Sequence, residues 1–175
     1  MGVNHGVIPG PDAGVLLEMT TEIGERLVSR NQTVTTVESC TGGGVAYTLT
    51  RVPGSSRWFH RGFVTYDNRA KSAMVNVPAD LIAAHGAVSL EVAAAMVRGT
   101  RDIAGADYGI SITGIAGPDG GSASTPVGTV CFGWLSPGGR IVTERRHFEG
   151  DRDSVRIQSI HYALGKLLDL VGQDD

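Results

Sequence analysis

The sequence predicts an α/β fold, a three-layer α/β/α sandwich around a mixed, mostly parallel sheet of about five strands. Helical and buried-strand patterns alternate through the first two thirds of the chain. A strong hairpin signal at 136–139, Ser-Pro-Gly-Gly, then separates two late strands, and an amphipathic helix follows. In folds of this class, ligands gather outside the carboxyl ends of the parallel strands.

The expected elements follow in order along the chain. Apolar residues at a helical period predict a first helix at 15–29, and a β-branched run predicts a strand at 33–39. The pattern then predicts helices at 42–51, 68–74, 78–85 and 89–103, strands at 59–66, 108–113, 127–135 and 140–148, and a last helix from Val155. Ser89 is expected as an N-cap and Asn76 as a left-handed helix stop. We expect one domain at 15–175 after a flexible, Gly/Pro-rich segment at 1–14.

Composition excludes several functional classes. With 41% hydrophobic and 19% charged residues, the 175-residue chain is typical of a globular protein. A net charge of −3 gives no electrostatic footprint for nucleic acid or an anionic membrane. The sequence has no apolar run of membrane-spanning length and no secretory signal, and its two cysteines form neither a disulfide framework nor a metal cluster. We therefore expect a cytoplasmic protein.

The most informative segment is 36–44, Thr-Val-Glu-Ser-Cys-Thr-Gly-Gly-Gly, where the first strand turns into a helix. Such a turn holds Ser39 at the sheet edge and points unpaired helix N–H groups at the same place, which suits a nucleophile facing a developing oxyanion. Two alternatives remain open from the local sequence. Ser39 and Thr41 could simply cap the helix, and Cys40 could be the nucleophile instead.

Lys71 is the candidate base for Ser39. The chain carries 13 arginines and only two lysines, Lys71 and Lys166, and a lysine can lose its proton where an arginine cannot. To act near neutral pH, the Lys71 pKa must fall from about 10.4 to roughly 7–8. We expect burial and a neighbouring Arg69 or Arg152 to lower it. The alternative is a surface lysine on a short helix.

Two further segments supply candidate contacts for an anion. The glycine-rich loop at 113–122 starts with Thr113-Gly114 and is not a Walker loop, but exposed backbone N–H groups in such a loop can hold a phosphate or carboxylate. Arg152 opens the last helix, where its guanidinium could clamp a phosphate through two hydrogen bonds. A mobile loop and a surface ion pair are the respective alternatives.

Taken together, these motifs resemble the CinA C-terminal domain family. The resemblance runs in order over roughly residues 15 to 170, through the segments at 38–43, 66–71, 86–89, 113–118, 126–130 and 150–152. It implies a stand-alone nicotinamide-nucleotide amidase, which converts nicotinamide mononucleotide (NMN) and water to nicotinic acid mononucleotide and ammonia without a metal or another cofactor. One departure is Ser124-Thr125, where an acidic-basic pair is expected.

The resemblance also implies roles for individual residues. Ser39 would attack the amide, Lys71 would take and return the proton, and Tyr66 would assist. The implied substrate contacts are Cys40, Thr41, Gly42, Gly43, Asn68, Thr113, Gly114 and Arg152, the last for the 5′-phosphate. A homo-oligomer is expected. A non-catalytic nucleotide-binding or regulatory module, and an amidase that uses the Cys40 thiol, are the competing hypotheses.

Overall fold

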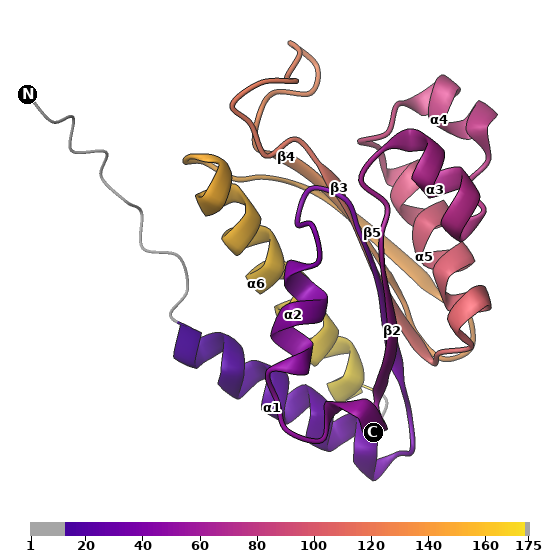
Figure 1. Cartoon of the computed structure of the whole chain (residues 1–175), viewed down its shortest axis with the longest axis vertical. Helices are drawn as coiled ribbons and strands as arrows, with labels where there is room; N and C mark the ends of the chain where they lie inside the picture. The colour runs from indigo at the N-terminus through magenta and orange to yellow at the C-terminus, as the bar shows by residue number, and fades with distance from the viewer. Residues whose placement is uncertain (1–12, 174–175) are drawn as a thin grey trace, which may run out of the picture.

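The computed structural model describes residues 13–173, which form a five-stranded mixed sheet with helices on both faces (Figure 1). The strands are β1 (Val34–Glu38), β2 (Phe59–Val64), β3 (Tyr108–Gly114), β4 (Thr129–Leu135) and β5 (Ile141–His147), in the order β2-β1-β3-β4-β5. The central strand β1 pairs in parallel with β2 and β3, whereas β4 is antiparallel to both β3 and β5. All strands except β4 therefore run in one direction, which confirms the predicted fold class.

The helices form two layers. One face of the sheet is covered by α1 (Ala13–Ser29), α2 (Gly44–Thr50) and α6 (Arg152–Gln173), and the other by α3 (Asn68–Val75), α4 (Ala79–His85) and α5 (Leu90–Ala104) (Figure 1). A short 3-10 turn, η1 (Ser55–Arg57), leads into β2. Residues 1–12 of the expected flexible segment lie outside the described residues, and Ala13 and Gly14 begin α1.

Local sequence explains where several helices begin and end. The Ser89 hydroxyl accepts the Val92 N–H at 3.3 Å at the start of α5, as predicted. Asp67 caps α3 in the same way by accepting the Ala70 N–H at 2.6 Å. Asn76 ends α3 with φ at 57°, which confirms the predicted left-handed stop.

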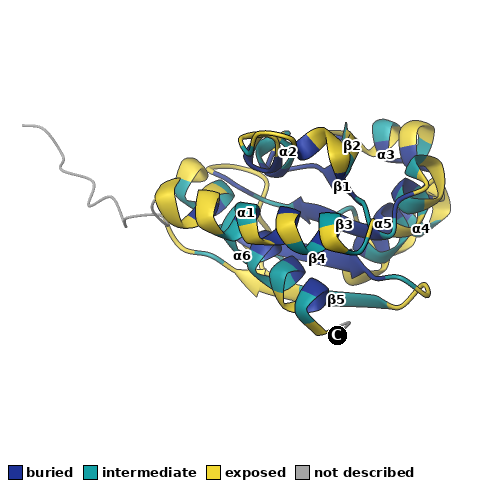
Figure 2. Cartoon of the chain, turned by 90° about the horizontal axis from the view of Figure 1, so that it is seen from below, coloured by how far each residue is buried: buried dark blue, intermediate teal, exposed yellow. Residues whose placement is uncertain are grey.

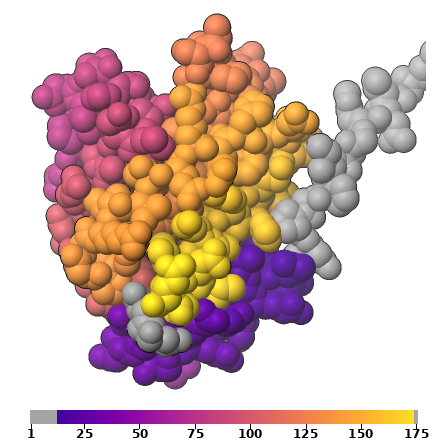
Figure 3. Space-filling model, turned by 180° about the vertical axis from the view of Figure 1, so that it is seen from behind, coloured from indigo at the N-terminus to yellow at the C-terminus, as the bar shows by residue number. Residues whose placement is uncertain are grey.

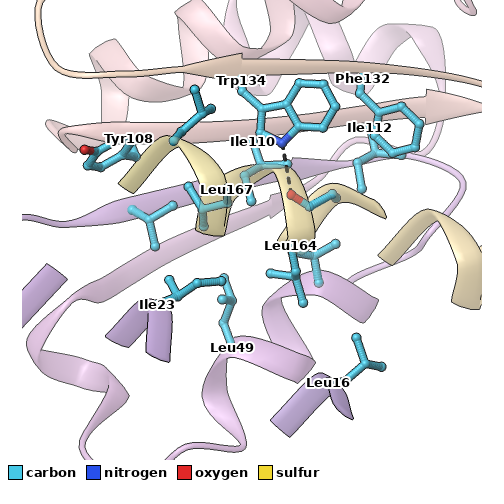
Figure 4. Packing of buried hydrophobic residues seen from close by; sticks show 14 of the residues in the cluster. Leu16, Ile23, Leu49, Tyr108, Ile110, Ile112, Phe132, Trp134, Leu164 and Leu167 are labelled. Atoms are coloured by element: carbon cyan, nitrogen blue, oxygen red, sulfur yellow. Dashed lines mark hydrogen bonds between the residues drawn. The ribbon is translucent and has the colours of Figure 1, made fainter. Parts of the chain in front are cut away.

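The main core lies between the sheet and the layer of α1, α2 and α6. Figure 4 shows Ile110 and Trp134 of the sheet facing Leu164 of α6, with Ile23 of α1 and Leu49 of α2 lower in the view, and all five side chains are buried. The Trp134 indole N–H donates to the Ala163 carbonyl at 3.0 Å, which ties β4 to α6. This packing fixes α6 against the sheet and so determines where its first residue, Arg152, lies.

The strands in the middle of the sheet are buried, and the outer surfaces of the helices are exposed (Figure 2). Strands β1, β3 and β4 are buried almost throughout, whereas the edge strand β2 is largely exposed. A second, smaller apolar cluster lies beneath α5 and includes Val37, Val75 and Met96. Within 13–173, no helix is long and apolar enough to cross a membrane.

Candidate active site

The two predicted turns lie side by side at the carboxyl edge of the sheet. Glu38 at the end of β1 is paired with Ile112 of β3, and the Ser39 N–H donates to the Ile112 carbonyl at 2.9 Å. Ser39 therefore lies next to the Thr113-Gly114 end of β3. This contact follows from the parallel pairing of β1 and β3, as expected for a ligand site in an α/β sheet.

Lys71 lies on α3, the helix that follows β2, and its side chain reaches Ser39. Strand β2 pairs with β1, and the Thr65 N–H donates to the Glu38 carbonyl at 2.8 Å, so α3 begins beside the Ser39 turn. Lys71 Nζ lies 3.2 Å from Ser39 Oγ and donates to the Thr65 carbonyl at 3.1 Å. Lys71 is 1% exposed and Ser39 7% exposed, so the pair is nearly excluded from solvent.

Burial sets the protonation behaviour of Lys71. The loss of hydration lowers its pKa below the ordinary value of 10.5, whereas the nearby Cys40 and Asp67 act in the opposite direction. The expectation that Arg69 or Arg152 also lowers the Lys71 pKa is wrong, because neither cation is among the causes of the shift. Burial alone moves the amine toward the neutral form that a base requires.

Cys40 has the opposite character. The side chain is 5% exposed, and burial, assisted by the charge of Glu38, raises the pKa of its thiol to about 12. A thiol with so high a pKa stays protonated at neutral pH, and the thiolate is the nucleophilic form. These values favour the hydroxyl of Ser39 over the thiol of Cys40 as the attacking group.

The turn between β1 and α2 contains two glycines, and the cap of α2 comes from a residue before the turn. Gly42 and Gly43 have φ angles of 60° and 96°, which side chains with a Cβ rarely adopt. The predicted alternative in which Ser39 and Thr41 cap α2 is wrong. The Glu38 carboxylate takes the N–H groups at the start of α2 instead, so the Ser39 hydroxyl remains available to Lys71.

A pocket of about 240 Å³ opens above Ser39. It is lined by Ser39, Cys40, Tyr66, Gly114, Ile115, Ala116, Gly117, Asp119, Gly120 and Arg152. The loop after β3 supplies most of the wall, and it projects from the molecule beside the lobe formed by α3 and α4 (Figure 3). Both predicted turns and Arg152 thus contribute to one pocket.

Arg152 and Tyr66 form the rim of this pocket. The Arg152 guanidinium donates to the Gly117 carbonyl at 2.7 Å and to the Tyr66 hydroxyl. Tyr66 is 57% exposed, and its hydroxyl is directed to Arg152, whereas its backbone carbonyl lies 3.5 Å from Ser39 Oγ. In this arrangement Tyr66 approaches the serine through its backbone.

Three predicted contact residues have side chains outside the pocket. The Thr113 hydroxyl donates to the Ala87 carbonyl at 2.8 Å, and Thr41 is fully buried, with no hydrogen-bond partner for its hydroxyl among the described residues. Asn68 is exposed at the start of α3 and lines a separate hollow of about 630 Å³ between α3 and α4. Thr41 and Thr113 each follow or precede a residue that lines the pocket, Cys40 and Gly114 respectively, so their backbones lie beside it.

Sequence reasoning gave no role to two charged residues beside the turn. Glu38 is buried at the end of β1, and Arg156, one helical turn after Arg152, donates to the Thr41 carbonyl at 3.2 Å. A carboxylate at the end of a β-branched, buried strand was an available signal for Glu38, and the spacing of four from Arg152 was one for Arg156. The pair Ser124-Thr125, which differs from the family pattern, is held from outside the site by Arg145, which donates to the Ser124 carbonyl at 2.8 Å.

The site is formed without a cluster of metal-ligating side chains. Across residues 13–173, no group of three or more His, Cys, Asp and Glu side chains is close enough to hold a metal ion. The pocket is lined by the hydroxyls of Ser39 and Tyr66, the Cys40 thiol, the Asp119 carboxylate, the Arg152 guanidinium and the backbone of the loop after β3, and the Lys71 amine contacts Ser39 from behind the lining. An anionic ligand with a polar carbonyl would find partners among them.

Fold and site define an α/β protein that presents a buried serine–lysine pair at the carboxyl edge of its parallel strands. The CinA C-terminal domain model matches residues 16–171, and the chain belongs to this family. It is 51% identical over 152 residues to a protein named nicotinamide-nucleotide amidohydrolase PncC from Pseudomonas putida, covering 87% of this chain and 94% of the relative. The PncC protein of Escherichia coli strain K12 is also 51% identical, with 87% and 92% covered.

Solved structures agree with the family assignment. The crystal structure of competence damage-inducible protein A from Klebsiella pneumoniae superimposes with a TM-score of 0.87 at 36% identity, covering 91% of this chain and 99% of that one. The competence/damage inducible protein CihA from Agrobacterium tumefaciens gives a TM-score of 0.87 at 35% identity, covering 94% and 99%.

Proposed function

We propose that this chain is a nicotinamide-nucleotide amidase, which hydrolyses the carboxamide of NMN to nicotinic acid mononucleotide and ammonia and so serves pyridine nucleotide salvage. The names of the PncC relatives support the reaction. The single structural observation that carries it is the 3.2 Å contact between Lys71 Nζ and Ser39 Oγ in a nearly dry site. A serine needs an adjacent base to attack an amide, and this amine is adjacent.

In the first half of the proposed reaction, the neutral Lys71 amine takes the hydroxyl proton as Ser39 Oγ attacks the carboxamide carbon. The carbonyl π electrons move onto oxygen, and backbone N–H groups of the Ser39 turn stabilise the resulting oxyanion. The tetrahedral intermediate then collapses, the C–N bond breaks, and Lys71 returns the proton to the departing nitrogen. Ammonia leaves, and a nicotinoyl ester remains on Ser39.

In the second half, water attacks the ester carbon while Lys71 takes one of its protons. The C–Oγ bond breaks, the proton passes to Ser39 Oγ, and nicotinic acid mononucleotide is released. The same amine thus acts as base and then as acid in each half, which requires a pKa near the working pH. The burial that lowers the Lys71 pKa supports this assignment.

Arg152 is the proposed partner of the 5′-phosphate. Its guanidinium is held at the pocket rim by the Gly117 carbonyl and the Tyr66 hydroxyl. A planar guanidinium recognises phosphate through two parallel hydrogen bonds. Because the Thr113 side chain turns away, the proposed contacts of this segment with the substrate come from the backbone of the loop that starts at Gly114.

Ammonia release from NMN by purified protein tests the proposal, with Ser39→Ala and Lys71→Ala as variants. Loss of the nucleophile should reduce kcat by about 10⁶-fold and loss of the base by roughly 10²–10⁴-fold. Lys166→Ala is the matched lysine control, because Lys166 pairs with Glu144 at 3.0 Å outside the pocket.

The same experiment separates the competing hypotheses. Calorimetric titration of NMN into Ser39→Ala should still detect binding. Binding of NMN by folded wild-type protein without any ammonia release would contradict the amidase and support the binding module. Turnover that disappears in Cys40→Ala but survives in Ser39→Ala would instead assign the thiol as nucleophile.

A further inference from the structure

Glu38 is a buried carboxylate next to the nucleophile that the proposed reaction does not use. It is 1% exposed at the end of β1. One carboxylate oxygen accepts the N–H groups of Gly43 at 3.1 Å and Val45 at 3.0 Å, and the other accepts that of Ala46 at 2.8 Å. Hydrogen bonds from N–H groups to an ionised acceptor are strong, and the start of a helix favours negative charge.

These hydrogen bonds join the end of β1 to the start of α2 across the turn that carries the nucleophile. The chain leaves β1 at Glu38, passes through the Ser39 turn and enters α2, where the Glu38 side chain reaches back across the turn to the first residues of the helix. The residue at the N-cap position, Gly43, has no side chain with which to cap α2. A carboxylate five residues earlier therefore does what a local cap does elsewhere.

The glycines in the turn make such an external hold necessary. Gly42 and Gly43 are both in the left-handed region, and glycine loses more backbone freedom on folding than any other residue. A turn built on them has little intrinsic preference for one geometry. The carboxylate supplies the constraint that the turn residues lack.

Most N–H groups of the turn already have an acceptor within the protein. The Ser39 N–H donates to Ile112 at 2.9 Å, that of Gly42 to the Ser39 carbonyl at 3.0 Å, and that of Gly44 to the Thr41 carbonyl at 3.1 Å. With Gly43 committed to Glu38, only the N–H groups of Cys40 and Thr41 in this turn have no acceptor from another residue in the described part of the chain. The N–H after a nucleophile is a common oxyanion donor.

We propose that Glu38 is a positioning residue for the reaction: its buried carboxylate fixes the Ser39 turn onto α2 and so leaves the Cys40 N–H as the donor for the developing oxyanion. The inference rests on the proposed function above and extends it to the residue that shapes the oxyanion site. The charge of Glu38 also opposes ionisation of the adjacent Cys40 thiol. Burial is the main reason why the Cys40 thiol stays protonated, and the carboxylate that orders the oxyanion donor adds to this effect.

The test is the variant Glu38→Gln, which keeps the shape of the side chain and removes its charge. The first measurement is the rate at which phenylmethylsulfonyl fluoride labels Ser39, followed by mass spectrometry, because this reaction needs the activated serine but not NMN. The second measurement is kcat and KM for NMN. Loss of an ordered oxyanion donor should slow labelling and lower kcat by about 10- to 1,000-fold, with KM within about threefold of wild type.

Glu144→Gln is the matched control. The Glu144 carboxylate also accepts three hydrogen bonds, from Tyr162, Arg146 and Lys166, but it lies on β5 outside the pocket. Its loss should lower stability while labelling of Ser39 and kcat stay within about twofold of wild type. An equal loss of labelling in both variants would mean that stability alone is being measured, and would overturn the proposal.

The remaining outcomes are also decisive. A folded Glu38→Gln protein with wild-type labelling and kcat, or with a change in KM alone, would overturn the inference. If Glu38→Gln does not fold, Glu38→Asp is measured instead, because its side chain keeps the charge but is shorter by one methylene. Slower labelling in Glu38→Asp supports the inference, and wild-type labelling contradicts it. Wild-type protein that labels at Ser39 without hydrolysing NMN would refute the proposed substrate while leaving the role of Glu38 testable.

Discussion

Replacing Lys71 by Met should change how protein stability depends on pH. Burial lowers the pKa of Lys71 in the folded protein, whereas the unfolded chain restores the ordinary value near 10.5. Between these two pKa values the unfolded state binds more protons than the folded state. Stability therefore rises with pH across that window, by about 1.4 kcal/mol per pH unit. Below the window both states are protonated, and the full cost of burying the cation remains.

The Met side chain removes both the free-energy cost of burying the Lys71 cation and the dependence of stability on pH that Lys71 causes. It occupies a site that is 1% exposed without bringing a charge, but it leaves the Thr65 carbonyl without its donor. An unpaired buried carbonyl costs about 1–3 kcal/mol. The stability of wild type relative to Lys71→Met should consequently increase by about 1.4 kcal/mol per pH unit inside the window and stay constant below it.

Urea unfolding of both proteins, from about pH 6 to about pH 10, measures this difference directly. Lys166→Met is the control, because Lys166 is paired with Glu144 at 3.0 Å and is only about two-thirds buried by its side-chain exposure of 32%. Parallel stability curves for wild type and Lys71→Met would refute the reasoning, since they would show that Lys71 has the same pKa in both states. The kcat/KM of wild type should rise through the same folded-state pKa as the amine becomes neutral.

Three further predictions concern the nucleophile, the rim and the helix packing. Cys40→Ala should keep kcat within about threefold, and iodoacetamide should leave wild-type activity intact at neutral pH, because the thiol pKa is about 12; inactivation by labelling at Cys40 would contradict this. Arg152→Gln should raise KM for NMN by roughly 10- to 100-fold and abolish the preference for NMN over nicotinamide riboside, which lacks the phosphate; an unchanged preference in steady-state assays would remove Arg152 from the phosphate site. Gly99→Ala should lower the unfolding free energy by at least about 1–3 kcal/mol, because its Cβ would lie 1.8 Å from the Val75 carbonyl oxygen at the end of α3; urea unfolding with wild-type stability would refute that packing.

Much of the fold followed from local patterns. The alternation of helical and strand periods gave the α/β class, and the hairpin signal at 136–139 gave the antiparallel pair at the end of the sheet. Ser89 and Asn76 were located because capping and left-handed stops depend on one or two residues. The element bounds moved by a residue or two at most ends, as is usual where the last turn of a helix or strand frays.

Several features of the site could not come from local sequence. Ser39 and Lys71 are 32 positions apart, and only the parallel pairing of β1 with β2 brings α3 back to the Ser39 turn. The cause of the Lys71 pKa shift was also misjudged in part. Nearby arginines in the sequence suggested repulsion between cations, whereas the packed structure lowers the pKa through burial alone.

The sequence by itself determined which chemical groups this protein has and which elements carry them: a serine after a buried strand, a lysine on a short helix, a glycine-rich loop and an arginine at a helix start. Tertiary structure decided which of those groups meet. It directed the Tyr66 hydroxyl to Arg152, turned Thr113 toward Ala87, and used Glu38 to close the nucleophile's turn. The physical reason is range: periodicity, capping and turn geometry act over a few residues, whereas burial and hydrogen bonding depend on neighbours that only the folded chain brings together.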